Sequence, residues 1–158
     1  MRALILAPAL LLAACGSSDS EGTQISINGD NFSAGMGKDG KVAIDVPGFK
    51  GNIDLPKIQL DASDFDINGV SLPAGSKITN MDIAGKDGSQ GGVRVAFTSP
   101  VTPVAVRDWF QGKLAAEGFK LTANGNDLSG TTQDGKAFSL VTKANGTGAT
   151  DSVLTVGG

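Results

Sequence analysis

The chain has 158 residues, of which 16 are acidic and 13 basic, so its formal net charge is −3; it contains one cysteine and no histidine. This weak negative charge argues against nucleic acid as a partner. The absence of histidine excludes Ser-His-Asp and Cys-His catalysis and the usual zinc sites, and the single cysteine excludes a disulfide within the chain.

Residues 1–14 have the pattern of an export signal. Arg2 supplies one positive charge, and residues 3–12 contain no polar side chain. This apolar run is about ten residues long, whereas a helix that spans a membrane needs roughly 20. We therefore expect residues 1–14 to be a signal peptide and not a transmembrane anchor.

The residues Leu12-Ala13-Ala14-Cys15 close this run and resemble the lipobox of bacterial lipoproteins, which signal peptidase II cleaves before the cysteine. The resemblance implies that Cys15 begins the mature chain and carries fatty acyl chains of the palmitate type, which hold the protein on a membrane. Because Gly16 and not Asp follows the cysteine, the sorting rule of that family implies the periplasmic face of the outer membrane. The alternative is a plain secretory signal with a chance cysteine.

Residues 15–23 consist of the cysteine and eight small or acidic residues. This composition predicts a flexible tether. From residue 24 to residue 84, apolar and polar side chains alternate as in half-buried strands with one wet face. Asn68-Gly69 lies between two such runs and predicts a type I′ hairpin turn. We therefore expect an antiparallel β meander over residues 24–84.

Residues 85–92 contain four glycines and no apolar side chain, and we interpret them as a linker to a second unit over residues 93–158. That unit begins with an alternating strand, continues with a helix and ends with a run of strands separated by Asn-Gly and Asp-Gly turns. The order β-α-β-β-β predicts an α+β fold, mostly antiparallel β with one helix packed on a sheet.

The helix is predicted over residues 103–117 from the signals at its two ends. Thr102 is a favourable N-cap, and Pro103 fits the first helical position. Gly118 is typical of the residue that ends a helix, and Phe119 after it is placed to contact Leu114 in the last turn.

Four polar residues, Asp61, Asp64, Asp66 and Asn68, are the candidate ligand residues of the chain. Residues 64–69 match the opening D-x-D-x-N-G of an EF-hand calcium loop, whose oxygens surround a hard cation. The twelfth position is Gly75 where that loop requires a bidentate glutamate, so the match is partial. These residues allow two alternative functions for the chain. One is a protein that binds a metal or a small ligand through them, and the other is a minor hydrolase that uses the same carboxylates. No catalytic motif and no cofactor site is recognised.

Residues 70–157 carry a second resemblance. The segment 72–77, the strand that ends at residues 97–99, the helix that ends at residues 114–119 and the closing strands look like small envelope-lipoprotein domains of unknown function, and the topology is similar to helix-grip domains of accessory lipoproteins. The resemblance implies a non-enzymatic binding or envelope-assembly module. We expect such a module to dock an envelope protein or polymer at a strand edge or in a groove between helix and sheet.

Overall fold

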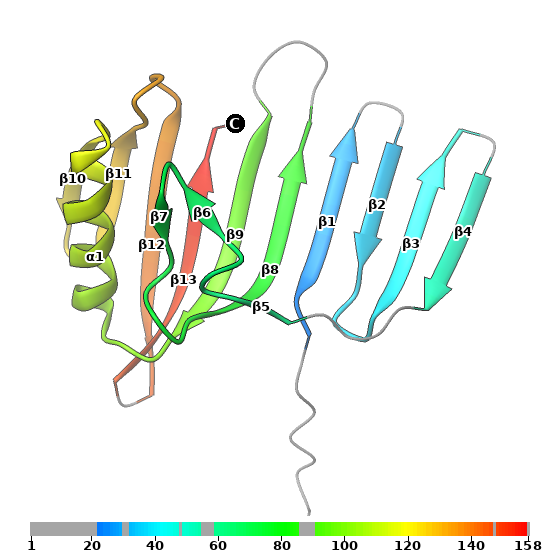
Figure 1. Ribbon diagram of the computed structural model, residues 1–158, viewed down its shortest axis with the longest axis horizontal. Helices are drawn as coiled ribbons and strands as arrows, with labels where there is room; N and C mark the ends of the chain where they lie inside the picture. Colours follow the sequence, from blue (N-terminus) through cyan, green and yellow to red (C-terminus); the bar gives the residue numbers. More distant parts are fainter. Residues whose placement is uncertain are drawn as a thin grey trace, which may run out of the picture.

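The computed structural model describes residues 22–29, 32–47, 49–54, 59–85, 91–146 and 148–157. The predicted signal peptide and Cys15 lie outside these residues. Thirteen strands and one helix occupy the described ranges (Figure 1). The helix packs against a mostly antiparallel sheet, so the predicted α+β class is confirmed.

Eleven of the strands form one long sheet, with the spatial order β10-β11-β12-β13-β9-β8-β1-β2-β3-β4 and with β5 beside the start of β8. The remaining strands, β6 and β7, pair with each other. The elements in chain order are β1 (Gln24–Gly29), β2 (Phe32–Met36), β3 (Lys41–Val46), β4 (Phe49–Asp54), β5 (Leu60–Asp61), β6 (Asp66–Ile67), β7 (Val70–Ser71), β8 (Lys77–Ala84), β9 (Gly92–Ser99), α1 (Pro103–Ala116), β10 (Lys120–Asn124), β11 (Asp127–Thr131), β12 (Ala137–Asn145) and β13 (Ala149–Val156).

Strands β8 to β13, together with α1 and the β6–β7 hairpin, form what we call the covered half. The helix and the hairpin lie over the same face of the sheet (Figure 1), and their apolar side chains join those of the strands in one core cluster. The fully buried members include Val95, Leu140 and Leu154 from the strands and Val106, Phe110 and Leu114 from α1.

The helix begins and ends where its sequence signals predict. The Ala105 N–H donates to the Thr102 hydroxyl at 3.4 Å, and Pro103 occupies the first turn. At the other end the Phe119 N–H donates to the Leu114 carbonyl at 3.0 Å, while Gly118 has a positive φ of 85°. This is the hydrogen bond of a Schellman ending, and buried Phe119 then begins the return to the sheet.

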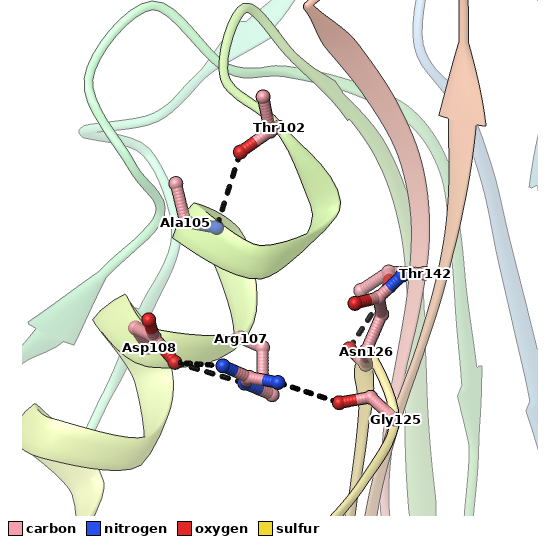
Figure 2. A network of polar contacts seen from close by, with 7 residues as sticks. All are labelled: Thr102, Ala105, Arg107, Asp108, Gly125, Asn126 and Thr142. Atoms are coloured by element: carbon pink, nitrogen blue, oxygen red, sulfur yellow. Dashed lines mark hydrogen bonds and ion pairs between the residues drawn. The ribbon is translucent and has the colours of Figure 1, made fainter.

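Arg107 attaches the outer side of α1 to the turn between β10 and β11. Its Nη1 donates to the Gly125 carbonyl at 2.6 Å, and its Nη2 lies 2.7 Å from a carboxylate oxygen of Asp108 (Figure 2). On the other side of that turn, the Thr142 hydroxyl donates to the Asn126 carbonyl at 2.9 Å. The turn is therefore fixed to both the helix and β12.

The predicted hairpin at Asn68-Gly69 is confirmed. Asn68 and Gly69 have φ values of 50° and 82°, as a type I′ turn requires, and β6 pairs with β7 on either side. The indole N–H of Trp109 donates to the Ser71 carbonyl at 3.0 Å. This hydrogen bond joins α1 to the hairpin, so both belong to one layer over the sheet.

Strands β1 to β4 form a second region, which we call the wing. Apart from β1 beside β8, these strands pair only with one another. The antiparallel pairs β1–β2, β2–β3 and β3–β4 agree with the predicted meander. However, β1 pairs with β8 in parallel, so the prediction of one antiparallel meander over residues 24–84 is wrong at this junction.

The segment interpreted as a linker, residues 85–92, connects two neighbouring strands. Ala84 pairs with Gly92, and β8 and β9 remain antiparallel partners along their length. Val70 and Ile78, which precede this segment in the chain, are buried in the same core as α1. The strands on either side of this segment therefore belong to one sheet, and the division at residues 85–92 does not separate two cores. Residues 86–90 of the predicted linker lie outside the described residues.

The predicted tether also ends earlier than residue 23. Thr23 is fully buried; its hydroxyl donates to the Ile78 carbonyl at 2.6 Å and accepts from the Leu60 N–H at 2.9 Å. These bonds hold the start of β1 against β5 and β8. The folded region therefore includes Thr23.

Candidate functional site

The candidate ligand residues lie in two exposed turns around β5 and β6. A carboxylate oxygen of Asp64 accepts from the Asp61 N–H at 2.7 Å, and the Asp64 N–H donates back to the Asp61 carbonyl at 3.0 Å. A carboxylate oxygen of Asp66 accepts from the Gly69 N–H at 2.8 Å. Each of these carboxylates therefore stabilises its own turn, which is a common role of Asp beside tight turns.

The carboxylates of Asp61, Asp64 and Asp66 are not grouped as metal ligands would be. Asp61, Asp64, Asp66 and Asn68 are all exposed. Across the described ranges of the chain, no group of three or more His, Cys, Asp or Glu side chains is arranged to hold a metal ion. The structure thus supplies turn formation as the reason for the D-x-D-x-N-G pattern, and Asp61, Asp64 and Asp66 do not form the group of ligands that the calcium alternative requires. The hydrolase alternative stays a prediction.

The groove expected between helix and sheet is filled with side chains. Val106, Phe110 and Leu114 point from α1 into the core, and none of the three is exposed. The rings of Phe110 and Phe97 lie with their centroids 6.2 Å apart, so the helix contacts β9 closely. The space between α1 and the sheet is therefore part of the core.

We call the opposite face of the sheet the helix-free face. It carries the outward-pointing side chains that alternate along each strand with those of the core. On β12 and β13, Val141 pairs with Val153, and Val153 pairs in turn with Ala96 on β9. Because side chains alternate along a strand, these residues point away from Leu140 and Leu154. Val141 is 54% exposed, one of the most exposed large apolar side chains among the described residues.

A depression of about 590 Å³ lies on this face. Its lining includes Ala96, Thr98, Val141, Lys143, Asp151 and Val153. Lys38, from the turn between β2 and β3, also contributes to the lining, so the depression reaches from β12 towards the wing. The depression thus combines a small apolar centre with hydroxyl and charged groups around it.

A second depression, of about 510 Å³, lies in the wing; most of its lining side chains point to the helix-free face, but those of Ala34 and Ile44 point to the other face. Its lining includes Ser26, Asn28, Ser33, Gly35, Ala43 and Asp45. On strands β8 and β9, Arg94 lies 3.7 Å from Asp82, which also accepts from the Asn80 side-chain amide at 2.6 Å. The helix-free face is therefore broad and mainly polar, with paired charges of both signs.

Sequence reasoning identified the wet faces of the strands but did not place a site on them. The available signal was Val141, an apolar residue at an outward position between the inward Leu140 and a polar Thr142. That signal was insufficient, because the depression depends on which strands are neighbours. The pairing of β13 with β9 joins residues about 55 positions apart in the chain, and no local pattern specifies it.

Comparisons with models of protein families, with curated proteins and with solved structures found no match. No helix in the described ranges is both long and apolar enough to cross a membrane.

Proposed function

We propose that this chain is a lipoprotein anchored through Cys15 to the periplasmic face of the outer membrane, where it acts as a non-enzymatic binding module. The helix-free face is the docking surface for an envelope protein or polymer. The lipobox-like residues support the anchor, and the 590 Å³ depression beside exposed Val141 is the observation that carries the docking surface. A concave surface with a small apolar centre and several polar groups is typical of binding sites.

The position of the anchor suits this role. Thr23 is fixed to Ile78 and Leu60, so residues 16–22 are the chain that separates the folded region from the lipidated cysteine. Seven residues span at most roughly 23 Å when fully extended, at about 3.3 Å per residue. The folded region would therefore stay close to the membrane yet leave the sheet accessible to partners in the periplasm.

The anchor is tested by mass spectrometry of the protein isolated from bacterial envelopes. We expect a mature chain that begins at an acylated Cys15. The matched variant Cys15→Ser should carry no acyl chains and should not be cleaved before residue 15. A native protein with an unmodified thiol at position 15 would contradict the proposed anchor and the compartment derived from it.

The docking surface is tested by photo-crosslinking in living cells. A photoreactive amino acid in place of Val141 lies on the helix-free face, whereas the same amino acid in place of Val104 lies on the outer side of α1. Val104 is a close control because it is 45% exposed, compared with 54% for Val141. We expect discrete crosslinked products at position 141 and none at position 104. Products of equal yield at both positions would contradict a dedicated helix-free docking surface.

A further inference from the structure

The wing presents an aliphatic face that continues the core face of the covered half. The register places Ile25, Met36 and Val42 in one row across β1, β2 and β3, and this row begins beside Met81 and Val95. Ile27, Ala34 and Ile44 form the next row, which begins beside Ile83. We call the six residues of these two rows that lie on β1, β2 and β3, together with Val46, the apolar wing face.

The layer that covers this face over the rest of the sheet stops at the wing. The core cluster under α1 and the hairpin extends to Met81 on β8, but it includes no residue of β1 to β4. Within the described ranges, the contacts of β2, β3 and β4 are essentially those with neighbouring strands. Met36 is only 8% exposed, whereas Ile27 is 38% exposed and Ile25, Val42 and Ile44 are half-buried. Apart from Met36, the apolar wing face therefore lies on the core side of the sheet without a covering layer from the described part of the chain.

We propose that this face packs against the same face of a second copy of the chain, sheet on sheet, around a two-fold axis roughly parallel to the strands. A partner for this face must present an aliphatic, flat, sheet-sized surface, and a second copy has such a surface. Side chains from two sheets that pack in this way interdigitate across about 10 Å. The partner's wing would therefore occupy the same layer that α1 and the β6–β7 hairpin occupy over the covered half.

The size of the face agrees with a weak but specific dimer. The four strands of the wing lie about 4.8 Å apart and contain five or six residues each, at about 3.3 Å per residue, so the wing covers roughly 19 by 18 Å. Two such faces bury on the order of 1,000 Å² of accessible surface in total, which is near the lower limit for a specific interface. We expect a dissociation constant on the order of micromolar for the free protein.

The two-fold axis also agrees with membrane attachment, an argument that rests on the proposed anchor. An axis parallel to the strands places both copies of Thr23, at the starts of the two β1 strands, at the same end of the dimer. Both tethers can then reach one membrane. Confinement to that membrane raises the effective concentration of each copy towards the other, which favours a weak interface.

The first test measures self-association of the mature lipoprotein in detergent by analytical ultracentrifugation. We expect a monomer–dimer equilibrium in which Ile44→Lys raises the dissociation constant at least about tenfold. Ala43→Lys is the matched control, because Ala43 is exposed on the opposite face of the same strand, and it should change the constant less than about twofold. A monomer at all concentrations up to about 100 µM would overturn the proposal, and so would a dimer that Ile44→Lys leaves unchanged.

A milder variant and a crosslinking measurement guard against misfolding. Ile27→Thr changes an already 38% exposed side chain and should still weaken the dimer, with an unchanged circular dichroism spectrum. In membranes, the thiol introduced by Ile44→Cys should form a disulfide between two copies, whereas that introduced by Ala43→Cys should not, since Cys15 is acylated. The proposal would be overturned if the Ile44→Cys thiol formed no such disulfide. If that thiol were also shielded from a water-soluble maleimide, the face would be covered by lipid or by another protein.

Discussion

The covered half and the wing are parts of one sheet with the same alternating pattern, yet they differ in what lies over their apolar side chains. Leu154 in β13 and Ile44 in β3 both occupy inward positions, but Leu154 is fully buried and Ile44 is only half-buried. The difference is the second layer, because α1 and the β6–β7 hairpin lie over β13 and over no strand of the wing. Alternation thus determines which face is apolar, and burial depends on an element from elsewhere in the chain.

The strongest test of this comparison is the cost of shortening one inward side chain in each region. Leu154→Ala should lower the free energy of unfolding by about 2–5 kcal/mol, because it leaves a cavity in a closed core. Ile44→Ala should lower it by about 1 kcal/mol at concentrations where the protein is monomeric, because water already reaches that side chain. Chemical denaturation measures both values.

The neighbouring variant Val153→Ala controls for the general effect of a mutation in β13. Val153 points to the helix-free face and is half-buried, so its change should cost about 1 kcal/mol or less. Equal losses for Leu154→Ala and Ile44→Ala in the monomer would show that the wing is covered as fully as the rest of the sheet.

Amide hydrogen exchange should separate the two regions without any mutation. The ladder amides of β2 and β3 should open with a free energy at least about 2 kcal/mol below that of β9 and β13, because few apolar contacts oppose local opening of the wing. A rise in wing protection with protein concentration would link this difference to dimerisation. Uniform protection across the sheet at low concentration would contradict the comparison.

The parts of the fold that the sequence predicted are those that local chemistry determines. Thr102, Pro103 and Gly118 bound the helix because each meets a requirement of the backbone within a few residues. Asn68-Gly69 forms its hairpin for the same reason, since both residues tolerate a positive φ. The Asp64 and Asp66 carboxylates belong to the same class: their hydrogen bonds to backbone amides three residues away explain their spacing.

The parts that the sequence did not predict depend on pairs far apart in the chain. The glycines of residues 85–92 suit a linker between domains as well as a connection between neighbouring strands, and only the pairing of Ala84 with Gly92 shows that the flanking strands are neighbours. Likewise, nothing in the alternation of β1 indicates that Ile25 lies beside Met81 in a parallel pair. The helix-free depression follows from these pairings, so it could not be located before they were known.

A smaller effect is expected where the covering layer is attached to the sheet. Thr102→Ala removes the side-chain acceptor of the Ala105 N–H and should lower the free energy of unfolding by about 1 kcal/mol. Thr102→Ser retains the hydroxyl and should restore most of that stability. Thermal or chemical denaturation distinguishes the two variants. Equal stability of Thr102→Ala and the native protein would show that this 3.4 Å bond contributes nothing to holding the layer in place.

The smallest effect, and one of opposite sign, is expected at Ser152, a buried residue on the core side of β13. Its hydroxyl has no hydrogen-bond partner in the described part of the chain, whereas the hydroxyl of nearby Thr150 donates to the Val101 carbonyl at 2.6 Å. A buried hydroxyl without a partner loses its bonds to water and regains nothing. Ser152→Ala should therefore leave the free energy of unfolding unchanged or raise it by up to about 1 kcal/mol, while Thr150→Val should lower it by about that amount. If Ser152→Ala is instead destabilising, the Ser152 hydroxyl has a hydrogen-bond partner in solution, such as a buried water molecule, and the core of the covered half is not fully closed to water.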